Sequence, residues 1–316
     1  MSLAFVFPGQ GSQSVGMLAA LAAAEPVVRQ TFAEASSVLG YDLWALCQQG
    51  PESDLASTEK TQPAMLAAGV ATWRAWLGQG GPLPVAMAGH SLGEYTALVC
   101  SGALDFAAAI DLVRFRGQVM QRAVPLGQGA MAAVLGLDDA QIAEACREAE
   151  QGEVVEPVNF NSPGQVVIAG NAAAVARAIE GAKARGAKRA VTLPVSVPSH
   201  SRLMIGAAGR LAERLATVEV RMPNVPAVYT VDVQTHASPD GIRRALTEQL
   251  YKPVRWSETV RAMLGTGVTT IVECGPGKVL TSLNKRIERR PDLAMLAVDD
   301  PASLAAALAA CREKLP

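Results

Sequence analysis

Ser91 lies in a glycine-bracketed turn that is typical of a nucleophilic serine. The run Gly89-His90-Ser91-Leu92-Gly93 follows an apolar segment at 85–88 and precedes a helical pattern at 94–98. In a strand–turn–helix nucleophile elbow, small residues on both sides of the serine leave room for a strained turn. The helix that follows points its free N–H groups and its positive dipole end at the serine. The pattern predicts that Ser91 is a nucleophile; the alternative is a serine in an ordinary strand–helix loop.

A serine nucleophile needs a general base, and the chain has three histidines that could supply it. His90 adjoins Ser91, and neighbouring side chains on a sharp turn diverge, so we expect it to pack nearby without reaching the hydroxyl. His236 lies in a polar loop at 234–238, where a surface position is expected. His200 follows the serine in the chain, as the base does in α/β-hydrolase-like enzymes. We therefore assign His200 as the base by elimination.

The group that orients the His200 imidazole stays open at this stage. Asp232 and Glu273 lie near the ends of predicted strands. Either could complete a triad, and either could equally be a cap or a surface charge. A backbone carbonyl is the third possibility, because it can also accept a hydrogen bond from an imidazole N–H.

A second glycine-rich segment, Gly9-Gln10-Gly11, follows a predicted strand near the start of the sequence. It is not a phosphate-binding loop, because no lysine is close, and its glycine spacing does not fit the dinucleotide-binding fingerprint. In serine acyl-transfer enzymes, one oxyanion-hole N–H belongs to the residue after the nucleophile, and the other comes from a loop after a different strand. We therefore expect the N–H of Leu92 and this loop to stabilise a tetrahedral oxyanion.

The composition limits the class of protein. The chain has 316 residues, of which 50% are hydrophobic and 18% charged, and its formal net charge is −1. That is enough to bury a large core, and it gives no basic excess for nucleic acid. No apolar stretch reaches the ~18 residues of a membrane span, and no basic segment precedes the first apolar run. The five cysteines are far apart. We expect a cytoplasmic protein with reduced thiols and without metal, membrane or nucleic-acid partners.

Short apolar strands alternate with helical patterns along most of the chain. We expect strands at 4–7, 85–88, 228–231, 270–273 and 295–298, and helices at 61–77, 105–124, 257–264 and 302–311. Short and continuously apolar strands are typical of a parallel sheet that is covered on both faces. The predicted fold class is therefore α/β with a mostly parallel sheet.

The segment between residues 129 and 194 breaks this alternation. It indicates strand, helix, strand, strand, helix and strand at 131–135, 138–150, 154–160, 165–169, 172–185 and 189–193. The order βαββαβ is that of the ferredoxin-like unit. We expect residues 127–196 to form a subdomain inserted into a discontinuous core of residues 1–126 and 197–316. A cleft between the two parts would be the natural ligand site.

Together, these motifs resemble those of the malonyl-CoA:acyl carrier protein transacylases of bacterial fatty acid synthesis and the related acyltransferase domains of polyketide synthases. The resemblance runs nearly end to end. It rests on the segments Phe7–Gln13, Gly89–Glu94, Arg116-Gly117 with Met120-Gln121, Asn159–Gln165, Pro198–His200 and Glu273–Gly277. It implies an α/β-hydrolase-like core with a ferredoxin-like subdomain.

The resemblance also implies a ping-pong acyl transfer that supplies fatty acid biosynthesis. Ser91 would take the malonyl group from malonyl-CoA with His200 as the base, and the phosphopantetheine thiol of an acyl carrier protein would receive it. The N–H groups of Gln10 and Leu92 would form the oxyanion hole. The backbone carbonyl of Gln249 would orient His200. No metal or cofactor is implied, and we expect a monomer.

Arg116 is implied as the partner of the malonyl carboxylate, and the substrate class depends on it. A mid-helix arginine is more often solvated or held in a structural ion pair, and Arg114 or Arg122 could claim the same role. Only the resemblance favours Arg116. Without such an arginine, Ser91 and His200 would suit an esterase or thioesterase equally well. A non-catalytic subunit that binds carrier protein is the remaining alternative, and the intact serine and histidine argue against it.

Overall fold

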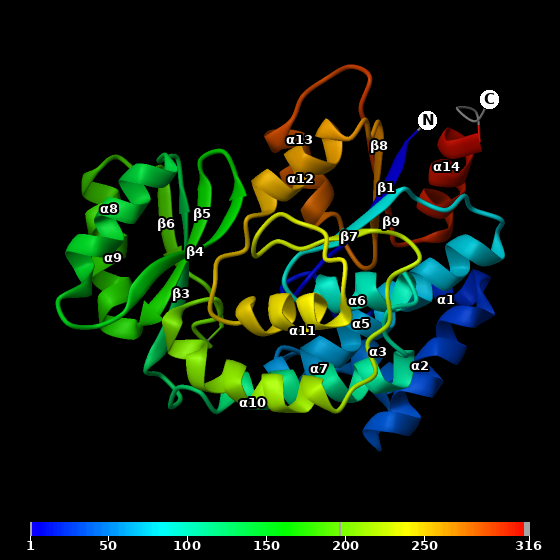
Figure 1. Cartoon of the computed structure of the whole chain (residues 1–316), viewed down its shortest axis with the longest axis horizontal. Helices are drawn as coiled ribbons and strands as arrows, with labels where there is room; N and C mark the ends of the chain where they lie inside the picture. The colour runs from blue at the N-terminus through cyan, green and yellow to red at the C-terminus, as the bar shows by residue number, and fades with distance from the viewer. Residues whose placement is uncertain (1, 196, 313–316) are drawn as a thin grey trace.

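Two β-sheets organise the chain (Figure 1). The computed structural model describes residues 2–195 and 197–312. Within these residues, five parallel strands form the larger sheet in the order β7-β2-β1-β8-β9, and four antiparallel strands form the smaller one. The smaller sheet and its two helices lie at one end of an elongated molecule. The predicted α/β class is confirmed.

The larger sheet is covered on both faces, as its apolar strands predict. Its strands are β1 (Leu3–Phe7), β2 (Ala86–Gly89), β7 (Ala227–Val228), β8 (Thr270–Cys274) and β9 (Ala294–Val298). Along β1, Phe5 and Phe7 enter the core formed with one set of helices, while Ala4 and Val6 enter the core on the opposite face. Successive side chains of a strand point to opposite faces, so both faces of β1 must be apolar.

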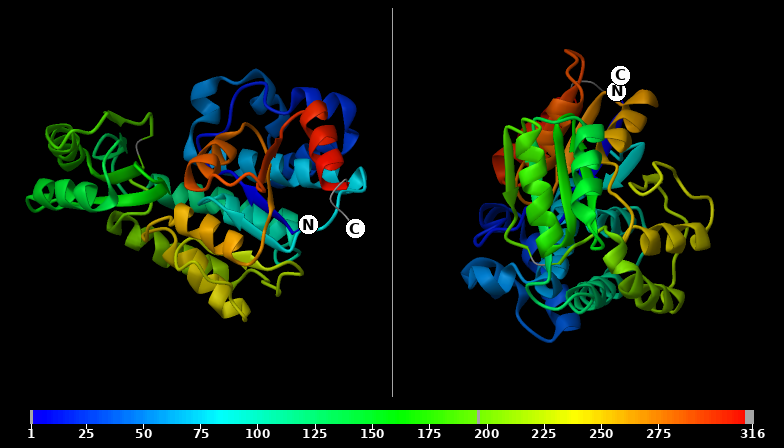
Figure 2. Two further views of the ribbon diagram at one scale, coloured as in Figure 1. Left: turned by 90° about the horizontal axis from the view of Figure 1, so that it is seen from above. Right: turned by 90° about the vertical axis from the view of Figure 1, so that its left-hand side faces the viewer.

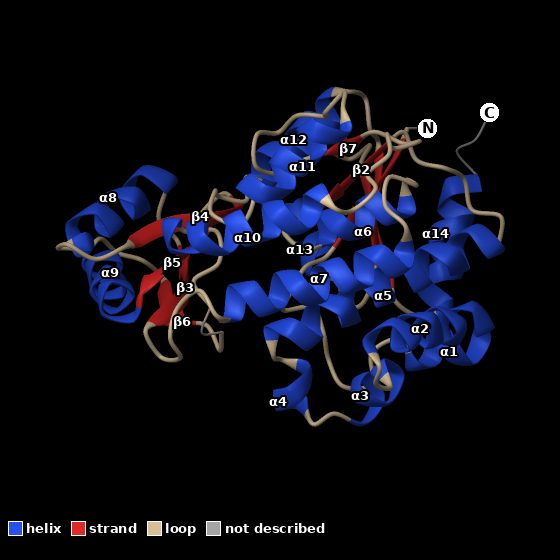
Figure 3. Cartoon of the chain, turned by 60° about the horizontal axis from the view of Figure 1, so that its bottom comes forward, coloured by secondary structure: helices blue, strands red, loops and turns tan. Residues whose placement is uncertain are grey.

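The helices divide between the two faces of the larger sheet. Helices α5 (Thr58–Gly78), α6 (Gly93–Cys100) and α7 (Phe106–Gln121) pack together on one side, which Figure 3 shows. Helices α12 (Trp256–Gly265) and α13 (Val279–Ile287) cover the other side. Outside the smaller sheet and its helices, the structure also has α1 (Ala19–Ala24), α2 (Pro26–Leu39), α3 (Leu43–Gln49), α4 (Glu52–Leu55), α10 (Ile205–Ala216), α11 (Pro239–Glu248) and α14 (Pro301–Arg312), with a 3₁₀ turn at Arg202–Met204.

The smaller sheet has the predicted βαββαβ order. Its elements are β3 (Gly129–Leu135), α8 (Asp139–Glu150), β4 (Val155–Ser162), β5 (Gln165–Asn171), α9 (Ala172–Ala184) and β6 (Arg189–Thr192). The strands lie in the order β4-β5-β3-β6, which is the ferredoxin-like arrangement. Helices α8 and α9 cover the face that points away from the larger sheet (Figure 2).

Main-chain hydrogen bonds connect the segment before α12 to strand β4 of the smaller sheet. Val254, just before α12, donates its N–H to the carbonyl of Val158 at 2.8 Å and accepts from the N–H of Phe160 at 2.9 Å. A short stretch of chain from the core thus pairs with β4. The proposed boundaries at 127 and 196 stay a prediction, and residue 196 and the last four residues of the core segment 197–316 lie outside the described residues.

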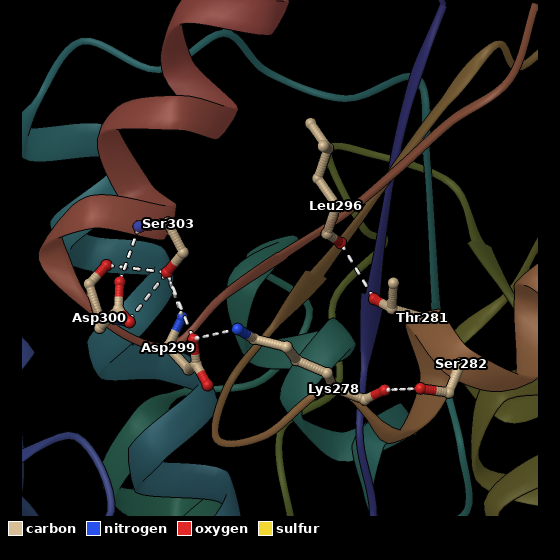
Figure 4. A network of polar contacts seen from close by, with 7 residues as sticks. All are labelled: Lys278, Thr281, Ser282, Leu296, Asp299, Asp300 and Ser303. Atoms are coloured by element: carbon tan, nitrogen blue, oxygen red, sulfur yellow. Dashed lines mark hydrogen bonds and ion pairs between the residues drawn. The ribbon is translucent and has the colours of Figure 1, made fainter.

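Polar side-chain contacts surround β9, the last strand in the order of the larger sheet, and the start of α14 (Figure 4). The Ser303 hydroxyl accepts from the N–H groups of Asp299 and Asp300, and the Ser303 N–H donates to the Asp300 carboxylate at 2.7 Å. Thr281 donates its hydroxyl to the Leu296 carbonyl at 3.1 Å, which ties α13 to β9. The contacts of Ser303 define where α14 begins.

Within the described residues, no helix has the length and apolar character to cross a membrane.

One predicted strand is shorter than expected. The apolar run 228–231 predicted a strand, but β7 ends at Val228 and residues 230–233 form a turn. The Tyr229 N–H donates to the Gln234 carbonyl and the Val233 N–H to the Tyr229 carbonyl, both at 2.9 Å. The turn brings the main chain of Thr230 to a buried carboxylate, which is described below.

Candidate active site

The turn that carries Ser91 has the geometry that its glycines predicted. Ser91 lies between the end of β2 and the start of α6 with a φ of 51°, a conformation that is uncommon for a residue with a side chain. A Cβ atom on Gly89 would lie 1.8 Å from the carbonyl carbon of Gly93, and one on Gly93 would lie 2.0 Å from the Phe7 oxygen. Only glycine fits at these two positions, so the sequence fixes the shape of the elbow.

His200 is brought to Ser91 from more than 100 residues away in the chain. The Ser91 hydroxyl and His200 Nε2 are 2.8 Å apart, and His200 Nδ1 is 2.6 Å from the Gln249 carbonyl oxygen. A carbonyl only accepts, so Nδ1 carries the proton and the Nε2 lone pair faces the serine. Burial, with the charge of Arg116, lowers the pKa of His200 to about 3. The imidazole is therefore neutral at pH 7 and able to accept a proton.

Neither carboxylate considered for the triad contacts His200. Glu273 is buried and accepts from the N–H groups of Leu280 and Thr281 at 3.0 and 2.7 Å, which caps the start of α13. Asp232 lies 3.2 Å from His236 Nε2. Of the three possibilities, the Gln249 carbonyl is the one that contacts His200.

The other two histidines lie away from the serine hydroxyl. His90 Nε2 is 2.8 Å from Asn161 Oδ1 of β4, and its ring packs against Trp256, so it has the packing position expected for it. The surface position expected for His236 is wrong. Its side chain is only 12% exposed because its ring packs against Tyr229, 4.9 Å away.

Arg116 is the arginine that reaches the serine. It is 1% exposed, and its Nη2 lies 3.3 Å from the Ser91 hydroxyl. Neutral amides hold the guanidinium: Nη1 donates to Gln62 Oε1 and Nη2 to Gln249 Oε1, both at 2.9 Å. Its Nε is buried and has no hydrogen-bond partner. By contrast, Arg114 is ion-paired with Asp111 on its own helix and partly exposed.

Burial of Arg116 also has an electrostatic consequence. Its Cζ lies 5.4 Å from the ring centre of Tyr95, a cation–π distance. Burial lowers the pKa of Arg116, while the neighbouring Tyr95 and Glu94 oppose that shift. No carboxylate lies within ion-pairing distance of its guanidinium in the part of the chain that the structure describes. Part of its positive charge therefore remains available for an anionic ligand.

The glycine-rich loop after β1 packs directly against the elbow. A Cβ atom on Gly9 would lie 2.5 Å from the His90 carbonyl oxygen, and the His90 N–H donates to the Phe7 carbonyl at 3.0 Å. Among the described residues, the N–H groups of Gln10 and Leu92 have no acceptor within the chain. Both loops follow neighbouring parallel strands and therefore share one edge of the sheet.

A cavity of about 450 Å³ opens beside this loop. Its wall includes Gln10, Gln121 and Arg122 from the larger part of the molecule and Pro194 and Val195 from the segment after β6. The cavity lies next to the loop that carries Gln10, but its lining includes neither Ser91 nor His200 nor Arg116, so the predicted ligand cleft stays a prediction. No cluster of histidine, cysteine and acidic side chains within residues 2–195 and 197–312 has the geometry to hold a metal ion.

Sequence reasoning missed a buried carboxylate next to the site. Glu94, three residues after Ser91, is 2% exposed and accepts from the Thr230 N–H, the Thr230 hydroxyl and Gln249 Nε2 at 2.7, 2.6 and 2.5 Å. Burial raises the pKa of Glu94 to about 7, while the donors of Thr230 and Gln249 and the charge of Arg116 oppose the rise. A single acidic residue in an otherwise apolar helix was the available signal. Gln62 was also missed and gave no comparable signal.

Known proteins match this chain over nearly its full length. Residues 4–298 match the acyl transferase domain family. The malonyl CoA-acyl carrier protein transacylase of Escherichia coli (strain K12) is 60% identical over 305 residues, which cover 96% of this chain and 98% of that protein.

Solved structures have the same fold. The malonyl-transacylase in a holo complex with a type II PKS acyl-carrier protein has a TM-score of 0.96 at 58% identity, covering 98% of this chain and 100% of that one. The malonyl CoA-acyl carrier protein transacylase of Coxiella burnetii also has a TM-score of 0.96, at 50% identity, covering 98% and 97%.

These matches define the class of protein as an acyl transferase with an α/β core and a second, antiparallel sheet. Within that class, the chain belongs to the malonyl CoA-acyl carrier protein transacylase family. The resemblance inferred from the sequence motifs is therefore confirmed.

Proposed function

We propose that the protein transfers the malonyl group of malonyl-CoA to the phosphopantetheine thiol of acyl carrier protein and so supplies fatty acid biosynthesis. The observation that carries this proposal is the position of Arg116. Its buried guanidinium, 3.3 Å from the Ser91 hydroxyl, is placed to hold a carboxylate beside the atom that attacks the thioester. The family and its full-length relatives support the same activity.

Acylation begins with proton transfer within the serine–histidine pair. His200 Nε2 accepts the hydroxyl proton as the Ser91 oxygen attacks the thioester carbonyl carbon. The N–H groups of Gln10 and Leu92 stabilise the oxyanion of the tetrahedral intermediate. When this intermediate collapses, the carbon–sulfur bond breaks, and coenzyme A leaves as the thiol with the proton from His200.

The second half-reaction reverses these steps with a different thiol. The phosphopantetheine thiol of the carrier protein gives its proton to His200 and attacks the malonyl–serine ester. Collapse of the second intermediate returns the proton to the Ser91 oxygen. The Gln249 carbonyl holds the imidazole in one tautomer throughout, so no triad carboxylate is needed.

Arg116 supplies the selectivity for a dicarboxylic acyl group. Its unpartnered Nε and its Nη2, which faces the serine, lie on one edge of the guanidinium. That edge matches the two oxygens of a carboxylate in a bidentate geometry. The two amides that hold the guanidinium, those of Gln62 and Gln249, are neutral and leave its charge for the substrate.

The proposal extends to the surroundings of the enzyme. A complex of a 58% identical transacylase with its carrier protein supports acyl carrier protein as a partner. We also propose that the enzyme works as a cytoplasmic monomer, without a metal or a cofactor. Residues 127–196 are proposed to form the inserted subdomain, and residues 1–126 and 197–316 the catalytic core.

Intact-protein mass spectrometry tests the proposal. After mixing with malonyl-CoA, the parent enzyme is expected to gain one malonyl group on a peptide that contains Ser91, and the Ser91→Ala variant is expected to gain none. Adding holo carrier protein should remove the label and give malonyl carrier protein. Labelling that persists in Ser91→Ala contradicts the nucleophile assignment. Release of free malonate instead of transfer would indicate a thioesterase.

A further inference from the structure

Glu94 is a buried acidic residue that the proposed chemistry does not use. One carboxylate oxygen accepts from both donors of Thr230, and the other accepts from Gln249 Nε2. Every neighbour that hydrogen-bonds to the Glu94 carboxylate therefore does so as a donor. An ionised carboxylate, which only accepts, satisfies this set completely.

The Gln249 side chain connects Glu94 to the proposed carboxylate-binding arginine. Its amide nitrogen donates to Glu94 at 2.5 Å and to the Ser91 carbonyl oxygen at 2.9 Å. Its amide oxygen then faces Arg116 and accepts from Nη2 at 2.9 Å. The two ends of a glutamine amide differ only in donor and acceptor character, so its neighbours decide which way it points.

We propose that Glu94 is a positioning residue for the malonyl selectivity of the enzyme, because it fixes the orientation of the Gln249 amide and thereby holds the guanidinium of Arg116 against Ser91. The inference rests on the proposed function, since it concerns the same substrate carboxylate. It assigns Glu94 no contact with the reacting atoms. Its effect travels through two hydrogen bonds, from Glu94 to Gln249 and from Gln249 to Arg116.

Replacing the carboxylate with an amide of the same shape breaks this arrangement in either orientation. If the new amide nitrogen of Glu94→Gln faces Thr230, it meets the Thr230 N–H, and two donors oppose each other. If it faces Gln249, it meets Nε2, and the Gln249 amide must turn. That turn places Nε2 against Arg116 Nη2 and displaces the guanidinium. Buried donors without acceptors are costly, so one of these changes must occur.

The test compares Glu94→Gln with the parent enzyme in kcat/KM for self-acylation by malonyl-CoA and by acetyl-CoA. Loss of a hydrogen bond to a charged group corresponds to a fall of about 10- to 100-fold in the malonyl-to-acetyl ratio. Acetyl transfer should change only a few-fold, because the backbone carbonyl of Gln249 still holds His200. A general loss of packing would lower both activities together, so the ratio separates positioning from structural damage.

Glu273→Gln is the matched control. Glu273 is also buried, but it accepts two main-chain N–H bonds, caps α13 and does not contact Gln249 or Arg116. We expect it to lower the thermal midpoint and leave the malonyl-to-acetyl ratio unchanged. If both glutamate variants change the ratio equally, the effect is one of general stability and the proposal is wrong.

A double-mutant cycle tests whether Glu94 acts on Arg116 through the side chain of Gln249. Gln249→Ala removes the amide and keeps the backbone carbonyl that orients His200, so adding Glu94→Gln in this background should change the ratio little further. Effects that multiply independently would show that Glu94 does not act through Gln249 and would overturn the inference. If the parent enzyme itself transfers no malonyl group, the proposed function fails; if it does and Glu94→Gln keeps the parent ratio, only this inference fails.

Discussion

Arg116→Ala is the substitution that most directly tests the substrate class. Malonyl and acetyl thioesters differ by one carboxylate, and the guanidinium of Arg116 is the buried cation beside Ser91. Removing one partner of a buried, hydrogen-bonded charge pair costs about 2–5 kcal/mol, which is roughly a 30- to several-thousand-fold loss in kcat/KM. Acetyl-CoA never forms this pair. The malonyl-to-acetyl ratio should therefore collapse by about that factor.

Neither of two side effects of the substitution would restore this ratio. Arg116→Ala leaves the amide oxygens of Gln62 and Gln249 without their buried donor, at a cost of about 1–3 kcal/mol each in stability. That cost is the same whichever thioester is bound. Loss of the positive charge also removes one cause of the low pKa of His200, so the base becomes stronger. Acetyl transfer should be spared or modestly raised.

The assay is single-turnover acylation of Ser91, followed by intact mass at matched concentrations of malonyl-CoA and acetyl-CoA. Arg114→Ala is the control, because Arg114 lies on the same helix but is ion-paired with Asp111. It should leave the ratio within a few-fold of the parent value. If Arg116→Ala instead lowers malonyl and acetyl transfer equally, Arg116 is a structural residue and the evidence for a dicarboxylic substrate is lost.

Three further outcomes are expected. His200→Ala should slow acylation by several orders of magnitude with the fold intact, whereas His236→Ala should not; comparable losses would undo the base assignment. Lys188 and Arg189 are exposed in the insertion, and reversing both charges should raise KM for an acidic carrier protein without changing malonyl-CoA acylation; unaltered kinetics at low salt would exclude this patch. Because the pKa of His200 falls from 6.5 to about 3 on folding, the unfolded chain binds a proton in that range that the folded chain does not. The contribution of His200 to the free energy of unfolding should therefore decrease from pH 6.5 to pH 3. Over that range the parent enzyme should lose more of its free energy of unfolding than His200→Gln, as measured by urea titration.

The parts of the fold that the sequence predicted are those governed by local rules. Continuous apolar runs of four to five residues predicted β1, β2, β8 and β9, because parallel strands buried on both faces need apolar side chains at every position. Gly89 and Gly93 predicted the elbow because any side chain there collides with the main chain within a few ångströms. The βαββαβ order of residues 129–194 predicted the smaller sheet, because the spacing of apolar residues differs between strands and helices and can be read within each segment.

The polar contacts of the site could not be predicted in this way. Glu94, Gln249 and Thr230 meet across more than 130 residues of chain, and nothing local to each residue records its partners. The same reason left Asp232 and Glu273 open as triad members and placed His236 wrongly on the surface. Whether a polar side chain is buried depends on what packs over it, and that is a property of the tertiary structure.

The way the arginine is held also bears on how the base works. Burial and, after it, the positive charge of Arg116 lower the pKa of His200 in the free enzyme, which keeps the imidazole neutral but makes it a weak proton acceptor. In the proposed reaction, a malonyl carboxylate on Arg116 would offset that charge and so raise the pKa of His200 at the moment the Ser91 proton must move; an acetyl group would not. A carboxylate of the protein paired directly with Arg116 would offset the charge permanently and compete with the substrate. Glu94, separated from Arg116 by the amide of Gln249, reduces the cost of burying the guanidinium and leaves its Nε without a hydrogen-bond partner.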